Sequence, residues 1–82
     1  MELIAIHPGE HLAHELKALG ISASELALTL DMPASRITGI LVGQDAITED
    51  AAMRLSRFFG VSADFWLSLQ DVYERRLRRY SI

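Results

Sequence analysis

The chain has 82 residues, of which 50% are hydrophobic and 23% charged, and it contains no cysteine. This length accommodates one compact core, and the composition is typical of a folded domain and not of a disordered segment. The lack of cysteine excludes a disulfide framework and a thiolate metal site. A single domain over residues 1–82 is therefore expected, and a chain this small is expected to gain stability by forming a homodimer.

The net charge of −3 is distributed unevenly along the chain. All 11 acidic residues lie within residues 1–74 together with only four basic ones, whereas residues 75–82 contain four arginines and no acid. A negative total argues mildly against nucleic-acid binding. An acidic body with a basic C-terminal end nevertheless leaves that function open.

The sequence predicts no targeting or membrane-anchoring segment. Residues 1–8 lack a basic region followed by an apolar stretch of about 7 to 15 residues, and no run approaches ~18 apolar residues. We therefore expect a cytoplasmic protein that has no membrane partner.

Five helices are predicted from the capping and turn residues that separate short hydrophobic runs. Pro8 suits the first turn of a helix that ends at Gly20. Ser22 and Glu25 match a capping box, in which each side chain satisfies the exposed backbone N–H of the other residue. This pattern predicts a second helix that starts after Ser22 and runs to about Leu30.

The third and fourth helices follow from the same kinds of signal. Asp31 tolerates the left-handed backbone that a tight turn requires, and Pro33 is expected to open the third helix, which stops at Gly43. Thr48 is a good cap for a fourth helix that ends at Gly60. No segment of the chain is predicted to form a strand.

A fifth helix is predicted over residues 63–79, and it would be ~25 Å long. Its large hydrophobic residues at helical spacing are expected to pack, some in the core and some across a dimer interface. A ligand pocket is the alternative interpretation. The residues assigned to the dimer interface are Phe65, Trp66, Leu69 and Tyr73.

Residues 22–42 combine two short helices and a tight turn, which is the helix-turn-helix arrangement. The second helix of such a motif enters the major groove of DNA. Its apolar side is predicted to face the core, so its other side is available to read bases. The candidate groove contacts are Ala34, Ser35, Arg36, Thr38 and Gln44.

Ser22 and Ser24 are candidate phosphate contacts, because the N-terminus of a helix favours anions. Such contacts set the register of the protein on DNA without reading sequence. The alternative interpretation of Ser22 is a helix cap alone, and that of the groove candidates is a solvated helix face.

Three histidines near the N-terminus, His7, His11 and His14, allow a metal site to be considered, since Glu10 and Glu15 lie beside them. A capped, partly exposed helix start is the favoured interpretation, because His7 precedes the helix and the order of residues differs from zinc-hydrolase motifs. No catalytic set of Ser, His and Asp or of Cys and His is discernible. The sequence thus predicts no enzyme, no cofactor and no small-molecule substrate.

Several short motifs, spread over about residues 6–73, resemble in sequence and in spacing the HigA/VapI-type antitoxins of the XRE helix-turn-helix family. The resemblance implies an all-α, five-helix, lambda-repressor-like domain. It also implies a bacterial homodimer that binds operator DNA, represses its own operon and neutralises a RelE-like toxin that cleaves mRNA. The matching segments are His7–Glu10, Leu19–Ser22, Arg36–Gly43, Ala46–Thr48, Ala51–Arg57 and Phe65–Gln70.

The chain departs from this family at the DNA-facing positions. Relatives often carry Gln or Arg at 23, 34 and 35, Asn at 38 and Lys at 44, and Gly in place of Asp31. Arg36 is the only base of the motif in this chain. Two alternatives therefore stay open: a stand-alone repressor without a toxin, and a protein-binding module that has lost DNA recognition. The acidic body is also expected to complement a basic toxin.

The arginine cluster in the last eight residues has three possible roles. It can contact DNA phosphates, pair with acidic residues of a second subunit, or favour the negative end of the fifth helix. The cluster consists of Arg75, Arg76, Arg78 and Arg79.

Overall fold

The computed structural model describes residues 5–80, which form five helices and, within that range, no strand. The all-α, five-helix expectation is confirmed. The predicted fifth helix over 63–79 extends one residue further than expected. The helices are α1 (Pro8–Leu19), α2 (Ala23–Leu30), α3 (Ala34–Leu41), α4 (Glu49–Phe59) and α5 (Ala63–Tyr80).

The helix starts that were predicted from capping residues are confirmed by their hydrogen bonds. Ser22 Oγ accepts from the Glu25 N–H at 3.1 Å, and Glu25 Oε1 accepts from the Ser22 N–H at 2.9 Å, which completes the capping box. Thr48 Oγ1 accepts from the Ala51 N–H at 3.2 Å at the start of α4. Caps of this kind stabilise a helix by about 1 kcal/mol each.

The turn between α2 and α3 differs from expectation by one residue. Asp31 is left-handed, with φ 57° and ψ 48°, as its residue type allows. Pro33, however, is the N-cap of α3 and not its first helical residue, because its ψ of 138° is extended. The helix itself therefore begins at Ala34.

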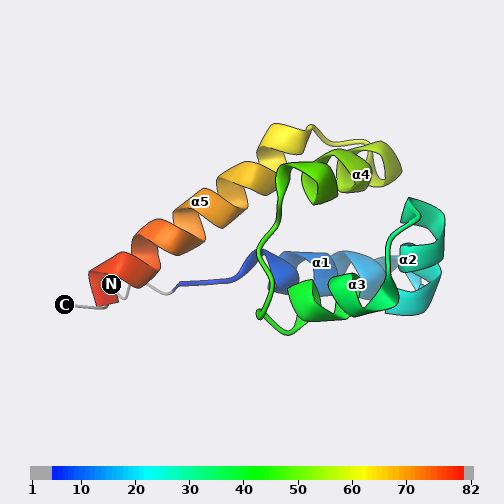
Figure 1. Ribbon diagram of the computed structural model, residues 1–82, viewed down its shortest axis with the longest axis horizontal. Helices are drawn as coiled ribbons and strands as arrows, with labels where there is room; N and C mark the ends of the chain where they lie inside the picture. Colours follow the sequence, from blue (N-terminus) through cyan, green and yellow to red (C-terminus); the bar gives the residue numbers. More distant parts are fainter. Residues whose placement is uncertain (1–4, 81–82) are drawn as a thin grey trace.

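The helices are arranged in two groups, as Figure 1 shows. α3 packs against both α1 and α2, and α2 lies at one end of α1 and α3. α4 packs on α5 and on α2, and α5 also touches α1 before its C-terminal turns extend away from the other helices (Figure 1). The helix-turn-helix thus lies at the opposite end of the molecule from the tip of α5.

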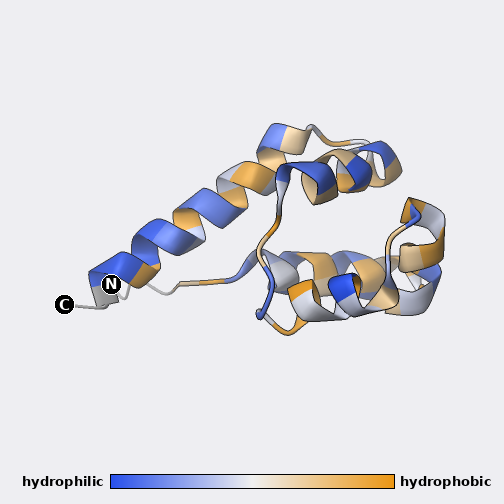
Figure 2. Ribbon diagram, viewed as in Figure 1, coloured by the Kyte–Doolittle hydropathy of each residue, from blue (hydrophilic) through white to orange (hydrophobic). Residues whose placement is uncertain are grey.

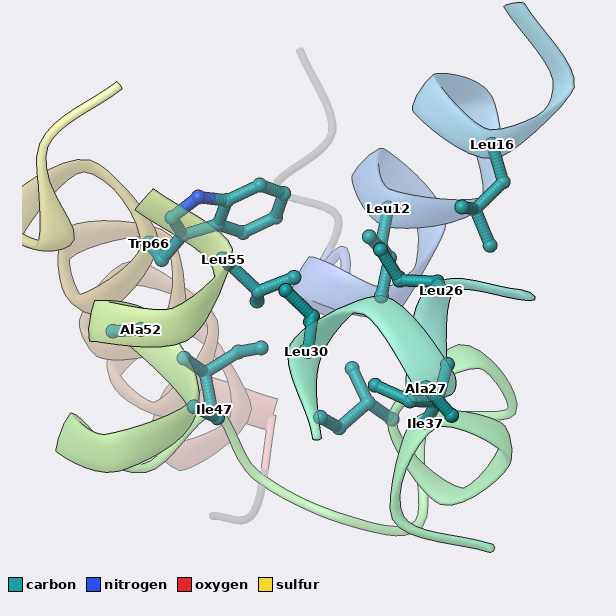
Figure 3. Close-up of a cluster of buried hydrophobic side chains, with 12 residues drawn as sticks. Leu12, Leu16, Leu26, Ala27, Leu30, Ile37, Ile47, Ala52, Leu55 and Trp66 are labelled. Carbon is teal, nitrogen blue, oxygen red and sulfur yellow. The ribbon is translucent and has the colours of Figure 1, made fainter. Parts of the chain in front are cut away.

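A single hydrophobic core lies between the two groups of helices (Figure 3). Trp66 of α5 and Leu55 of α4 meet Leu12 of α1 and the apolar sides of α2 and α3 there. Figure 2 shows hydrophobic residues on the facing sides of the helices and hydrophilic ones on the last turns of α5. Within residues 5–80, no helix has both the length and the hydropathy needed to cross a bilayer.

The N-terminus of α1 approaches the C-terminal end of α3 very closely. A Cβ atom at Gly9 would overlap the main-chain carbonyl of Ile40, so only glycine fits at this position. This contact fixes α3 against α1 and holds the outer side of α3 toward solvent.

Candidate nucleic-acid interface

α3 presents one buried and one exposed side, as the helix-turn-helix interpretation requires. Ile37 and Ile40 are fully buried in the core. Of the five candidate groove contacts, Arg36 is half-buried in the first turn of the helix. The other four are exposed: Ala34, Ser35, Thr38 and Gln44. The structure therefore places the predicted set on the free surface, and base contact by these side chains remains a prediction.

The N-terminus of α3 differs from the other helix starts in lacking a side-chain cap. A side-chain acceptor caps each of the other four helices within residues 5–80: His7, Ser22, Thr48 and Ser62. The first amides of a helix need an acceptor from outside the helix. The start of α3 is therefore the place in the described chain where a phosphate oxygen meets the least competition from side chains.

Ser22 and Ser24, the predicted phosphate contacts, both lie exposed at the start of α2. Ser22 Oγ already accepts a hydrogen bond from Glu25 N–H, but its hydroxyl proton remains free to be donated. The Glu25 carboxylate, bonded to the Ser22 N–H, places a negative charge at the same helix end. The cap interpretation of Ser22 is thus confirmed, and it is compatible with a phosphate contact.

The loop between α3 and α4, residues 42–48, carries Gln44 and is held on both sides. On the α3 side, the Gln44 N–H and the Asp45 N–H both donate to the Gly39 carbonyl, at 2.9 and 3.0 Å. On the α5 side, the Ile47 N–H donates to Gln70 Oε1 at 2.9 Å. No role of Gln70 is predicted from the sequence, although a polar residue one turn after Trp66 on the helix is a signal for one.

His7 supports the same loop from the N-terminus of α1. Its Nδ1 accepts from the Gly9 N–H at 2.9 Å, and its ring lies 4.8 Å from the Tyr73 ring in an edge-on contact. Burial lowers the pKa of His7, although a hydrogen bond to the Asp45 backbone and the charge of Glu10 oppose this effect. His7 is therefore held in its neutral form as a structural cap.

The three N-terminal histidines all line the groove between α1 and α5, but they are not arranged as metal ligands. Within residues 5–80, no group of three His, Cys, Asp or Glu side chains is arranged to hold a metal ion. His11 instead lies edge-on to Phe65 and Trp66 and is 3.6 Å from Glu15. His14 is exposed on the same helix.

The candidate dimer residues of α5 divide between core and surface. Trp66 is 1% exposed, so this part of the interface prediction is corrected: its indole packs inside one chain and leaves no surface for a partner. Phe65 is exposed, and Leu69 and Tyr73 are half-buried. A groove runs between α1 and α5. Its surface is mostly apolar, from residues such as Ile6, Pro8, Leu69 and Val72, but its lining also includes His7, Glu10, His11, His14 and Arg76.

The arginine cluster lies on the last turns of α5. Arg75 pairs with Asp71 at 3.0 Å, and both side chains are well exposed. Arg78 and Arg79 are exposed in the last turn, beside the negative end of the helix. A contact of this cluster with DNA or with a second subunit remains a prediction.

The fold and the exposed α3 define a helix-turn-helix protein, and the profile of the helix-turn-helix family matches residues 12–66. Virulence-associated protein I of Dichelobacter nodosus is 47% identical over 77 residues, which are 93% of this chain and 71% of that protein. An addiction module antidote protein of the HigA family from Coxiella burnetii has 49% identity and a TM-score of 0.90, over 92% of this chain and 83% of that one.

A third similar protein is the Pseudomonas aeruginosa antitoxin HigA, whose structure was solved with the higBA promoter. It is 38% identical, with a TM-score of 0.92 over 95% of this chain and 86% of that one. The chain belongs to the helix-turn-helix family, in the group of HigA-type antitoxins. Proteins of this group are DNA-binding regulators and not enzymes.

Proposed function

We propose that the chain is the antitoxin of a toxin-antitoxin system and represses its own operon by inserting α3 into the major groove of operator DNA. The observation that carries this proposal is the outer side of α3, where small polar side chains and Arg36 surround a helix start without a side-chain cap. Small side chains let the helix backbone approach the groove closely, and Arg36 can fork onto a guanine edge. The promoter-bound HigA of Pseudomonas aeruginosa supports the same use of the fold.

The acting form in this proposal is a homodimer with twofold symmetry. The apolar groove between α1 and α5, together with exposed Phe65 and half-buried Leu69 and Tyr73, offers a surface for a second copy. Twofold pairing would place the two α3 helices in successive major grooves about 34 Å apart.

The second partner in this proposal is a RelE-like toxin. An enzyme that cleaves RNA is expected to be basic, and the acidic body of this chain complements such a surface. If this is correct, the rate of association with the toxin falls as ionic strength rises. An association rate that does not depend on salt would remove the electrostatic part of this interpretation.

Two binding experiments and one mass measurement test the proposal. In the first, the purified chain is titrated into a labelled duplex that carries the promoter region upstream of its own gene, with a scrambled duplex as control. A specific shift supports the operator function, whereas equal binding to both duplexes contradicts it and favours a protein-binding module. Light scattering after size exclusion should give the mass of a dimer at micromolar concentration.

The second experiment separates an antitoxin from a stand-alone repressor. The chain is expressed with the product of the neighbouring gene, and co-purification is examined with and without promoter DNA. A stable complex with a small basic protein, and relief of its toxicity, supports the antitoxin function. Specific DNA binding without any such complex would identify a stand-alone repressor.

A further inference from the structure

The side chain of Gln70 on α5 forms a hydrogen bond with the loop of residues 42–48. It is 8% exposed, and its Oε1 accepts from the Ile47 N–H at 2.9 Å across the core-facing side of the loop. Its Nε2 donates to Glu74 Oε2 at 3.0 Å, one turn further along α5. A backbone donor on one side and a carboxylate on the other fix the orientation of the amide.

The loop that Gln70 contacts carries a candidate groove residue. Gln44 is exposed, while the loop behind it is anchored at Ile47 by Gln70 and at Asp45 by the hydrogen bond from its N–H to the Gly39 carbonyl. Ile47 itself is buried in the core. The loop is therefore held on the side that faces the core, while Gln44 is exposed on the side that faces solvent.

We propose that Gln70 is a positioning residue for DNA recognition: it holds the loop of residues 42–48 in the conformation in which Gln44 reaches the operator. This inference rests on the proposed function. Without the bond from Gln70, the Ile47 N–H is left without its partner, and the loop gains access to other conformations. Apparent affinity for DNA falls in proportion to the fraction of molecules with the loop in the competent state.

Gln70→Met is the variant that removes the contact, because methionine has a similar size and shape but cannot replace both hydrogen bonds. Leu67→Ala is the matched control: Leu67 also lies on α5, packs partly against the core and has no bond to the loop. Both variants are expected to lower stability. At a temperature where both are folded, only Gln70→Met should weaken binding to the labelled upstream duplex, by about tenfold.

A charge-swapped pair tests whether the hydrogen bonds themselves matter. In the double variant Gln70→Glu with Glu74→Gln, the new carboxylate can accept from both the Ile47 N–H and the new amide, and net charge is unchanged. Recovery of most of the lost affinity supports the positioning role. Affinity that stays at the level of Gln70→Met contradicts it.

Amide hydrogen exchange gives a readout that does not depend on DNA. In Gln70→Met the Ile47 amide should lose protection, while the amides of α4 around Leu55 keep theirs. A double-mutant cycle with Gln44→Ala should be non-additive, because the two residues act through one loop. Additive losses of affinity would show that Gln70 does not act on DNA binding through the loop that carries Gln44.

The outcomes distinguish this inference from the function on which it rests. If the unaltered chain does not bind the upstream duplex specifically, the proposed function is wrong and the positioning role is rejected with it. If the unaltered chain binds and Gln70→Met binds no worse than Leu67→Ala, only the positioning role is overturned.

Discussion

The guanidinium group of Arg54 on α4 closes the C-terminal end of α2 by donating from Nη1 to the Leu30 carbonyl at 2.7 Å. The same atom lies 3.1 Å from the Asp31 carbonyl, and Nε donates to Asp50 at 3.0 Å. The last carbonyls of a helix lack partners within it and carry partial negative charge. Arg54 therefore supplies both hydrogen bonds and a positive charge where α2 ends and the turn to α3 begins.

Replacing Arg54 should destabilise the fold more than its exposed ion pair suggests. Arg54→Ala removes the donors to two carbonyls, so we expect the free energy of unfolding in urea to fall by about 1 to 2 kcal/mol. Asp50→Asn is the control, because it removes the surface ion pair and leaves the bonds to α2. It should cost at most about 0.5 kcal/mol, and equal losses in both variants would contradict the capping role of Arg54.

Asp31 should tolerate asparagine but not alanine. Its φ of 57° is left-handed, and among non-glycine residues asparagine and aspartate adopt this conformation most readily. Asp31→Ala is therefore expected to lower the unfolding free energy by about 1 kcal/mol, whereas Asp31→Asn should leave it nearly unchanged. Chemical denaturation of the two variants in parallel measures this difference.

The same pair of variants bears on the charge next to the predicted DNA surface. Asp31→Asn removes a negative charge from the turn before α3, so its affinity for the upstream duplex should rise, with the largest gain at low salt. An affinity unaffected by this change at low salt would place the turn away from DNA.

His7 should make stability depend on pH. Burial lowers its folded-state pKa below the ordinary value of 6.5, so the unfolded chain binds the proton more readily. The stabilisation is complete above the ordinary value and is lost as pH falls through the lowered folded-state pKa. His7→Asn keeps a cap acceptor for the Gly9 N–H and removes the titration.

The measurement for His7 is the difference in unfolding free energy between the unaltered chain and His7→Asn, followed from pH 7.5 to pH 5 by denaturation. We expect the unaltered chain to lose unfolding free energy relative to His7→Asn as the pH falls. Because the two proteins differ only at residue 7, the contributions of all other groups largely cancel. A difference that stays constant over this range would show that the pKa of His7 does not differ between the folded and the unfolded chain.

The sequence allowed the helices to be predicted because their signals are local. The capping box links Ser22 to Glu25, three residues apart, and the left-handed turn depends on the identity of Asp31 alone. Pro33 was misplaced by one position because proline suits both the extended residue before a helix and its first turn. Such local signals determine the type of an element better than its boundary.

The contacts that position the candidate site were not predictable in the same way. Arg54 reaches Leu30 over 24 residues, and Gln70 reaches Ile47 over 23, so neither pair leaves a periodic pattern in the sequence. Trp66 shows the complementary error: helical spacing identified it as a packing residue, but only the three-dimensional fold shows that it packs within one chain. Spacing along a helix does not distinguish a core from an interface.

Arg36 provides the strongest test of DNA recognition, because it is the only basic residue of α2 and α3. If it reads a guanine through two hydrogen bonds, Arg36→Ala should cost about 1 to 3 kcal/mol of specific binding. Arg36→Lys keeps the charge but loses the planar fork, so it should recover the salt-dependent part of binding and not the sequence preference.

Arg57→Ala is the matched control for Arg36, since it removes the same charge from an exposed position on α4 outside the helix-turn-helix. Affinities for the upstream and scrambled duplexes, each measured at several salt concentrations, separate the two residues. Arg36→Ala should reduce the ratio between the two duplexes, whereas Arg57→Ala should leave that ratio intact. If the two variants behave alike, α3 does not read bases through Arg36, and a protein-binding role for the outer side of α3 becomes the better explanation.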